Sequence, residues 1–270
     1  AVDLLVLPST GAQLGVAVLG SGSGGQTFYT PDVMYSLAAR GFRVVNRRWH
    51  GDWTAGTIGM SGSACRYATL ITWIRAQPWS AGPLCVSGNS GGSAELAYGL
   101  SHWERGDVVD LAVLTGGPPM SRFDLVCPSE GAWVQSCSDV VPEAICGGIV
   151  NCAYNSSNYD LIDGAFEGTP CQDGGPVELL RAHSILSEEA RLAFPETRVH
   201  LIQGSEDCTS ASPQGYLYSD ALTSERIVEV ADAPHGVFST ADGAARIVAA
   251  FEQGCVCRHG DCEPSDAEER

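Results

Sequence analysis

The sequence predicts an α/β protein with a mostly parallel, twisted sheet covered by helices on both faces. Short apolar runs alternate along the chain with segments of helical periodicity, which is typical of parallel strands joined by helical crossovers. The segment Gly88–Gly92, a G-x-S-x-G pattern, lies directly between an apolar run and a helix-forming stretch. With 270 residues, of which 44% are apolar, the chain can bury one such core and needs no second domain.

The first part of the chain supplies strands and helices in alternation. A turn at residues 8–11 separates the first two apolar runs, and Gly41 ends the first helix. Between Tyr67 and Ile74, large apolar residues recur at helical spacing. The expected strands are residues 3–7, 14–19, 42–45 and 84–87, and the expected helices are residues 31–40, residues 64–76 and a stretch that begins at Ser93.

The remaining strands follow on either side of a long insertion. Periodicity is weak and cysteine, glycine and serine are frequent from about Pro118 to Pro195, which indicates a segment held by disulfides. Strands are expected at residues 110–115, 197–203 and 226–230, and helices at residues 177–191 and 240–253. The expected organisation is a core of residues 1–117 and 196–254, a cysteine-rich cap of residues 118–195 and a cysteine-containing acidic tail of residues 255–270. The last piece of this tail, residues 263–270, is expected to be disordered.

Ser90 is the expected nucleophile. A serine on a tight turn between strand and helix is held in a strained backbone geometry that exposes its hydroxyl, and small neighbours let the chain pass close to itself. The string Gly-Asn-Ser-Gly-Gly also resembles the nucleophile segment of chymotrypsin-like proteases, but in those proteins the histidine and aspartate precede the serine. Here the best acid and base candidates follow it. The alternative is a turn that only connects a strand to a helix.

His235 is the expected general base and Asp207 the acid that orients it. A proline before His235 and a glycine after it place it in a loop, and Asp207 follows a strand after a glycine turn, where its side chain can reach the carboxyl edge of the sheet. His50 is a weaker rival because it precedes the serine. Glu206 is the neighbouring alternative to Asp207, and Asp232 is weaker because it is too close to His235 in sequence.

Acyl transfer also requires hydrogen-bond donors for the developing oxyanion. The amide of Gly91, next after the nucleophile, is one expected donor. The glycine-rich loop at residues 20–25 should supply the other from Ser23, or otherwise from Ser21. Phosphate binding by this loop is the alternative, but the loop lacks a following Lys-Ser/Thr and the spacing of a dinucleotide fingerprint.

Eleven cysteines indicate an oxidising compartment and several disulfides, so we expect a secreted protein whose export signal has been removed. The odd number leaves at least one thiol free or paired between chains. Cys85, in the expected central strand, is the candidate for a buried free thiol, and a pairing with Cys65 is the alternative. The tail segment Cys255-Val256-Cys257-Arg258-His259-Gly260-Asp261-Cys262 could form a zinc site, although one residue between its first ligands is tighter than usual zinc spacings.

The net charge of −17 disfavours nucleic acid and anionic membrane surfaces as partners. It arises from 32 acidic residues against 15 arginines, and the chain has no lysine. Arg47-Arg48 is the only basic pair, so no phosphate-tracking face is visible, and no apolar run approaches the roughly 20 residues that span a bilayer. The Asn155-Ser156-Ser157 sequon matters only in a eukaryotic secretory host.

Four local motifs resemble those of the α/β-hydrolase superfamily, and the resemblance runs from about Leu14 to Phe251. They are the glycine loop at residues 21–25, the segment after a strand at residues 42–51, the elbow at residues 88–92, and the acid and base loops at residues 204–207 and 233–236. Ser21 stands where the family usually has histidine, and Arg48 stands where aspartate is common. Only about one strand precedes Leu14, so the antiparallel edge of the family's sheet should be trimmed.

The resemblance and the residues together predict a secreted serine hydrolase of the carboxylic ester hydrolase type, expected to be a monomer, that uses an acyl-enzyme and no cofactor or metal. The cap has few large apolar residues, which favours short-chain, aryl or polymer-borne esters, polyesters included, over a lipase. A peptidase or acyltransferase on the same fold, and a catalytically silent binding protein, are the alternatives. Four aromatic side chains are candidates for the substrate pocket, with core packing equally expected: Tyr29, Trp49, Trp53 and Trp133.

Overall fold

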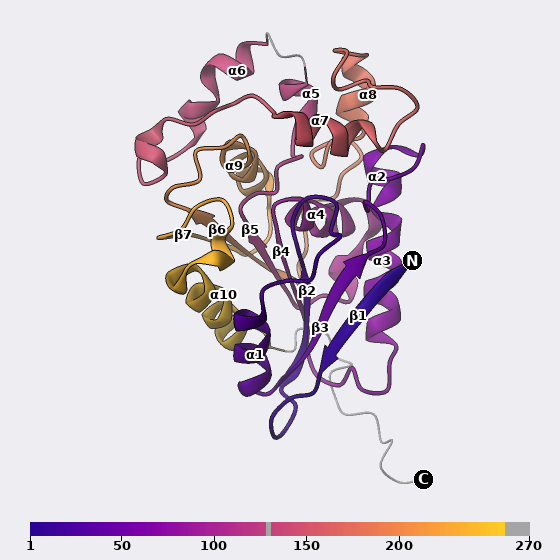
Figure 1. The fold of residues 1–270 in the computed structure, drawn as a ribbon, viewed down its shortest axis with the longest axis vertical. Coiled ribbons are helices and arrows are strands. Elements are labelled where there is room, and N and C mark those ends of the chain that lie inside the picture. The colour runs from indigo at the N-terminus through magenta and orange to yellow at the C-terminus, as the bar shows by residue number, and fades with distance from the viewer. Residues whose placement is uncertain (128–130, 257–270) are drawn as a thin grey trace.

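Seven strands form one sheet in the computed structural model, which describes residues 1–127 and 131–256 (Figure 1). The strands are β1 (Val2–Leu7), β2 (Gly15–Gly20), β3 (Phe42–Trp49), β4 (Leu84–Asn89), β5 (Leu111–Thr115), β6 (Arg198–Gly204) and β7 (Arg226–Ala231). Their order is β1-β3-β2-β4-β5-β6-β7, in which β1 pairs antiparallel with β3 and all other pairs are parallel. The mostly parallel sheet is confirmed.

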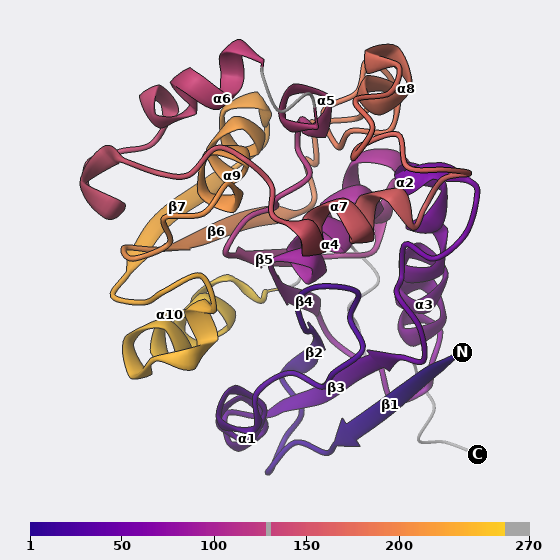
Figure 2. The ribbon, with the colours of Figure 1, turned by 45° about the horizontal axis from the view of Figure 1, so that its top comes forward.

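Helices cover both faces of this sheet (Figure 2). On one face lie α1 (Pro31–Ala39) and α10 (Ala241–Gly254), and on the other lie α3 (Cys65–Arg75), α4 (Gly91–Trp103) and α9 (Ala211–Ala221), with the short α2 (Gly59–Ser63) before α3. The alternation of side chains along a strand separates two cores. In β2, Val16 and Val18 join the core under α3 and α4, whereas Ala17 and Leu19 join the core under α1 and α10.

The expected strand at residues 42–45 is longer in the structure and reaches Trp49. The reason is that β1 pairs with β3 along its whole length, with Val2 opposite Trp49 and Leu7 opposite Val44. β1 and β2 are not neighbours in the sheet, because β3 lies between them. The family resemblance predicted a short antiparallel edge, and in the structure this edge consists of one strand, β1.

The described residues between 118 and 195 form a layer of short helices over the carboxyl ends of the parallel strands (Figure 1). The helices are α5 (Phe123–Val126), α6 (Ala132–Ser136), α7 (Ser156–Asp163) and α8 (Val177–Ala182), and 3₁₀ turns occupy Cys137–Val140 and Cys146–Gly148. Two further 3₁₀ turns, Arg105–Asp107 and Val237–Ser239, lie outside this layer. The expected helix at residues 177–191 was too long, since α8 ends at Ala182 and irregular chain follows. We call residues 118–195 the cap.

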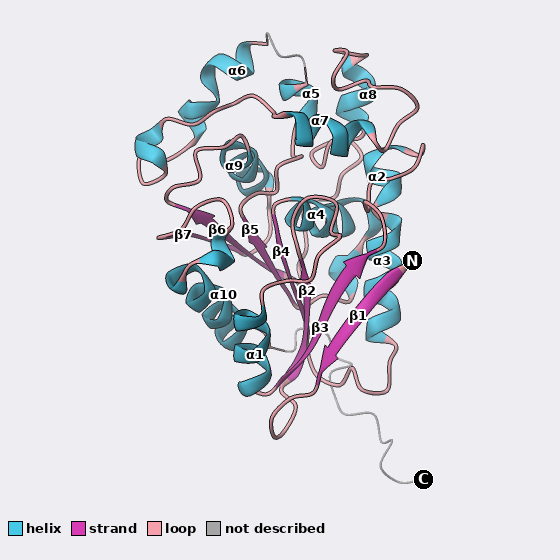
Figure 3. Ribbon diagram, viewed as in Figure 1, coloured by secondary structure: helices cyan, strands magenta, loops and turns pink. Residues whose placement is uncertain are grey.

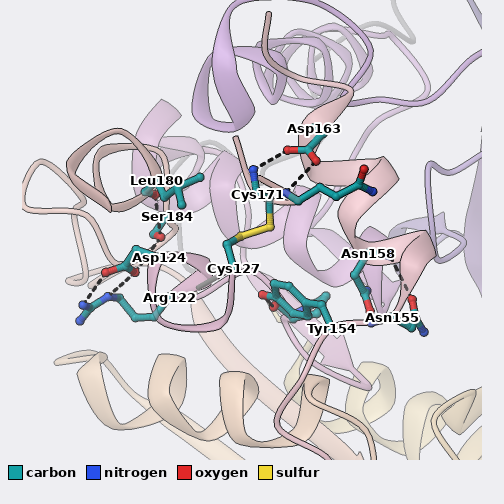
Figure 4. The surroundings of a disulfide bond; sticks show 12 residues. Arg122, Asp124, Cys127, Tyr154, Asn155, Asn158, Asp163, Cys171, Leu180 and Ser184 are labelled. Carbon is teal, nitrogen blue, oxygen red and sulfur yellow. Dashed lines mark hydrogen bonds and ion pairs between the residues drawn. A yellow bond between two sulfur atoms is a disulfide. The ribbon is translucent and has the colours of Figure 1, made fainter. Parts of the chain in front are cut away.

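Disulfides provide much of the framework of the cap. Cys127–Cys171 and Cys137–Cys152 lie within it, and Cys146–Cys208 joins it to the core. Figure 4 shows the first of these, beside the Asp163 carboxylate, which accepts the Cys171 amide at 2.6 Å and the Gln172 amide at 3.1 Å. The disulfide-rich cap expected from the sequence is present.

The fourth disulfide corrects the expectation for Cys85. Cys85 is bonded to Cys255, which follows α10, and is therefore neither a free thiol nor the partner of Cys65. In the described part of the chain, Cys65 is the cysteine that has no disulfide partner. Cys257, His259 and Cys262 lie outside the described residues, as does the acidic tail from residue 257 onward, but Cys255 is no longer available as a zinc ligand.

Candidate active site

Ser90 lies on the sharp turn between β4 and α4. Its backbone has φ 53° and ψ −120°, a region that non-glycine residues rarely occupy and that is maintained only where surrounding contacts impose it. The glycines on either side permit this turn. A Cβ on Gly88 would lie 2.4 Å from the carbonyl of Gly92, and a Cβ on Gly92 would lie 2.4 Å from the carbonyl oxygen of Ser21. The chain thus passes too close to itself for any larger residue.

Asp207 and His235 form a direct pair. Asp207 follows β6 and His235 follows β7, and the distance from Asp207 Oδ2 to His235 Nδ1 is 2.8 Å. The carboxylate is fully buried, whereas the imidazole is about one-third exposed, with 34% of its side-chain surface accessible. The other carboxylate oxygen of Asp207 accepts the Thr209 hydroxyl at 2.6 Å and the Thr209 amide at 3.2 Å.

Burial on its own would raise the pKa of Asp207, but the hydrogen bond and charge of His235 and the two bonds from Thr209 outweigh it, so that the pKa lies below its ordinary value. The carboxylate therefore stays ionised at neutral pH. An ionised carboxylate at Nδ1 fixes the imidazole tautomer that carries its proton there and leaves Nε2 unprotonated. His235 is thereby prepared to accept a proton at Nε2.

Ser90 and His235 line the same cavity, of about 540 Å³, at the carboxyl edge of the sheet. The cap helices lie beyond this edge, and the loop that follows β5 leads into them (Figure 3). The structure thus brings Ser90, His235 and Asp207 to one edge, where open α/β sheets place their ligands.

The rival candidates lie elsewhere. His50 is exposed at the edge of the sheet, with its Nε2 2.8 Å from Asp3. Glu206 is exposed and has no bond to His235 among the hydrogen bonds of the described residues. Asp232 is also exposed, and its amide bonds to Asp242 at the start of α10.

The glycine-rich loop after β2 packs against the start of α4. Ser23 has a positive φ of 49°, and a Cβ on Gly91 would lie 2.1 Å from the Ser23 carbonyl oxygen and 2.9 Å from its nitrogen. Gly91 is the first residue of α4, so its amide has no partner within the helix. Ser21 is buried and its hydroxyl donates to the Thr27 carbonyl at 2.6 Å, which makes it a brace of the loop.

A buried ion pair that the sequence did not indicate lies beneath this loop. Arg47, from β3, and Glu95, from the first turns of α4, are both fully buried and bonded to each other. Arg47 also donates to the Gly25 carbonyl at 3.1 Å, and Trp49 donates to the other Glu95 oxygen at 2.6 Å. Burial raises the pKa of Glu95, against the opposing effects of Arg47 and Trp49. The pair ties the glycine loop to the helix that follows Ser90.

None of the four aromatic candidates lines the cavity. Tyr29, Trp49 and Trp53 are buried in the core, and Trp133 packs within the cap. The aromatic residues that do line it are Phe28 and Phe238, which no sequence pattern indicated. In residues 1–127 and 131–256, no group of three or more His, Cys, Asp and Glu side chains is placed to bind a metal ion.

The loop that carries Asp207 is clamped to the cap. Cys208, the next residue, is bonded to Cys146, and the amide of Cys146 donates to the Ser205 carbonyl at 2.8 Å. In return, the Asn151 amide donates to the Cys208 carbonyl at 2.8 Å. The position of Asp207 therefore depends on the cap, a connection that spacing in the sequence could not reveal.

A seven-stranded, mostly parallel sheet with a strained serine turn after β4 and an Asp–His pair after β6 and β7 is the architecture of the α/β hydrolases, and this chain has that fold. Solved structures with the same fold include dienelactone hydrolase from Anabaena variabilis, at 14% identity and a TM-score of 0.53 over 94% of this chain and 90% of that one. Est1E from Butyrivibrio proteoclasticus, with ferulic acid bound, has 9% identity and a TM-score of 0.53 over 93% of each chain. Acylaminoacyl peptidase from Pyrococcus horikoshii has 13% identity and a TM-score of 0.62 over 99% of this chain and 41% of its own.

These similarities are structural. No protein-family model matches the sequence, and no curated protein matches it. Within the described residues, no helix has the length and apolar character needed to span a bilayer.

Proposed function

We propose that this protein is a secreted serine hydrolase that cleaves carboxylic esters through an acyl-enzyme. Ser90 is the nucleophile, His235 the general base and acid, and Asp207 the residue that orients the imidazole. The observation that carries the proposal is the 2.8 Å bond between Asp207 and His235 beside a serine in strained geometry, with Ser90 and His235 facing one cavity. A turn that merely connected a strand to a helix would need neither the strain nor the Asp–His pair.

In the first half of the reaction, Ser90 Oγ attacks the ester carbonyl carbon while its proton passes to His235 Nε2. The carbonyl oxygen of the tetrahedral intermediate then carries the negative charge, which the amides of Gly91 and Ser23 stabilise. Collapse of the intermediate breaks the bond to the alcohol oxygen, and the proton on Nε2 passes to that oxygen. In the second half, water attacks the acyl group with the same proton transfers and releases the acid and the free serine.

Supporting observations come from the fold and the cysteines. One solved structure with this fold is a dienelactone hydrolase, and a lactone is a cyclic ester. Another is Est1E with ferulic acid bound, and ferulic acid is a carboxylic acid, the kind of product that ester hydrolysis releases. Four disulfides among the described residues support extracellular or periplasmic location, because such bonds persist in oxidising compartments. The structural similarity to acylaminoacyl peptidase favours peptide hydrolysis as the second candidate.

The test is the rate of hydrolysis of p-nitrophenyl esters from acetate to palmitate by disulfide-intact protein and by Ser90→Ala. We expect the variant to lose at least about 10³-fold in kcat while keeping its fold. The series should favour short chains. Labelling by a fluorophosphonate in the wild type but not in the variant gives a readout that does not depend on the choice of ester. A folded wild type that neither hydrolyses these esters nor takes the label would refute the proposal.

A further inference from the structure

Polar side chains outnumber apolar ones in the lining of the cavity beside Ser90. Of its nineteen lining residues, eleven have polar side chains, three are glycines and five are apolar: Phe28, Pro119, Met120, Leu161 and Phe238. Ligand pockets are more often lined mainly by apolar and aromatic groups, with a few polar ones. The charged group here is the exposed Asp52, and no arginine belongs to the lining among the described residues. With a net charge of −17, the protein also repels anions, so the cavity suits an uncharged, hydroxyl-bearing group.

A second, smaller cavity meets the first at Ser90 and His235. Its volume is about 150 Å³, and its far wall is formed by Cys208, Thr209 and Ala211. A closed cavity of this volume holds benzene in another protein, so the smaller cavity has room for a group of about six carbon atoms. The Cys146–Cys208 disulfide holds the loop that bounds it. The two cavities therefore offer unequal space on the two sides of the nucleophile.

Asn155 and Asn158 line both cavities, at the boundary between them. They form a reciprocal cap at the start of α7: Asn155 Oδ1 accepts the Asn158 amide at 3.0 Å, and Asn158 Oδ1 accepts the Asn155 amide at 3.2 Å (Figure 4). These bonds fix which side-chain atom is oxygen and which is nitrogen. They use the two oxygens and leave both NH₂ groups without a hydrogen-bond partner among the described residues.

A hydrogen bond from the preceding residue holds the start of α7 in place. The hydroxyl of the buried Tyr154 donates to the Pro119 carbonyl at 2.6 Å, and Pro119 lines both cavities. The carboxamides of Asn155 and Asn158 are thus held on a supported helix end, with four N–H donors between them. Hydroxyl oxygens are natural acceptors for such donors.

We infer that, given the proposed esterase function, the natural substrates are short-chain esters of uncharged polyols such as sugars. The acyl group occupies the small cavity, the polyol occupies the large polar cavity, and the NH₂ groups of Asn155 and Asn158 bind its hydroxyl oxygens. The bond that breaks is the one between the acyl carbon and the polyol oxygen, which takes the proton from His235 as it leaves. This inference narrows the ester class and assigns two further residues to substrate binding.

The experiment compares four esters at equal concentration with wild-type protein made in a host that does not N-glycosylate Asn155. They are glucose 6-acetate, ethyl acetate, ethyl gluconate and p-nitrophenyl acetate. We expect kcat/KM for glucose 6-acetate to exceed that for ethyl acetate at least about 10-fold, since each additional hydroxyl bond adds binding that ethyl cannot make. Ethyl gluconate, which carries its hydroxyls on the acid side, should be a poor substrate.

The variants Asn155→Asp and Asn158→Asp keep the capping oxygens, remove the NH₂ donors and each add one negative charge. Each should lower kcat/KM for glucose 6-acetate by about 3- to 10-fold relative to p-nitrophenyl acetate. Gln172→Glu adds the same charge to an exposed cap position outside both cavities and is the control for charge. Asn155→Ser is an uncharged second variant that retains a good helix cap.

The outcomes separate the two proposals. If folded wild-type protein hydrolyses none of the four esters, the esterase function itself is refuted. Hydrolysis of p-nitrophenyl acetate without preference for glucose 6-acetate over ethyl acetate would leave that function standing and overturn the inference, as would a preference for ethyl gluconate. Variants that slow p-nitrophenyl acetate as much as the sugar ester would show that the two asparagines only support the fold.

Discussion

The buried ion pair between Arg47 and Glu95 leads to a quantitative prediction for Glu95→Gln. Neither side chain has any accessible surface, and the amide leaves the Arg47 guanidinium buried without its counter-charge. Removing one partner of such a pair costs about 3–5 kcal/mol of the free energy of unfolding. At about 2–4 °C per kcal/mol for a chain of roughly this size, Tm should fall by roughly 6–20 °C. The double variant Arg47→Met/Glu95→Gln should recover most of the loss, because no buried charge remains and the oxygen of the introduced carboxamide can still accept from Trp49.

The matched control is the ion pair between Arg40 and Glu252, whose side chains are 43% and 47% exposed. Glu252→Gln should cost no more than about 1 kcal/mol, because water already solvates both charges. Thermal unfolding followed by circular dichroism at neutral pH, with disulfides intact, measures all three variants. Equal losses in Glu95→Gln and Glu252→Gln, or a double variant as unstable as Glu95→Gln, would refute the reasoning that burial sets the cost.

Two further predictions concern the acid loop. Cys146→Ser/Cys208→Ser should reduce the free energy of unfolding, measured by urea denaturation, by about 2–4 kcal/mol. The same variant should also lower kcat, because the loop that holds Asp207 loses its covalent bond to the cap. Cys137→Ser/Cys152→Ser, confined to the cap, should destabilise without changing kcat, and an equal fall in kcat would argue against a link to the acid loop. The second prediction is that the stability difference between wild type and Asp207→Asn shrinks with acidity. The folded pKa of Asp207 is below the ordinary 3.8, so its stabilisation is fully present above about pH 4 and is lost as pH falls through the lower, folded value. Urea unfolding at pH 6 and pH 3 measures this, and an unchanged difference would contradict it.

The fold and the Asp–His pair could be predicted because their signals are local. Ser90 lies between a strand and a helix that are both evident from hydrophobicity, and the order of Asp207 and His235 after it selects one topology. Each of these residues follows a strand, and parallel strands bring their carboxyl ends to one edge whatever the cap does. The turn at Gly88 is equally local, because its close approach is to Gly92, whereas Gly91 and Gly92 approach the distant loop at residues 20–23.

The features that the sequence could not predict depend on contacts between segments that are distant in the chain. Cys85 is 170 residues from its partner Cys255, so no spacing rule could select the pairing. Arg47 was visible only as part of a basic pair, yet β1 and β2 on either side of β3 bury it against Glu95 from α4. Asn155 was visible only as part of a sequon, and its position beside the nucleophile follows from how the cap folds over the sheet.

The Cys85–Cys255 disulfide closes the chain into a covalent ring. Ser90, Asp207 and His235 all lie between its two cysteines, five residues or more inside the ring from either end. A single peptide-bond cut anywhere between residues 85 and 255 would therefore release no fragment under non-reducing conditions. In a protease-rich extracellular setting, a nicked molecule would keep the proposed nucleophile, base and acid on one connected chain.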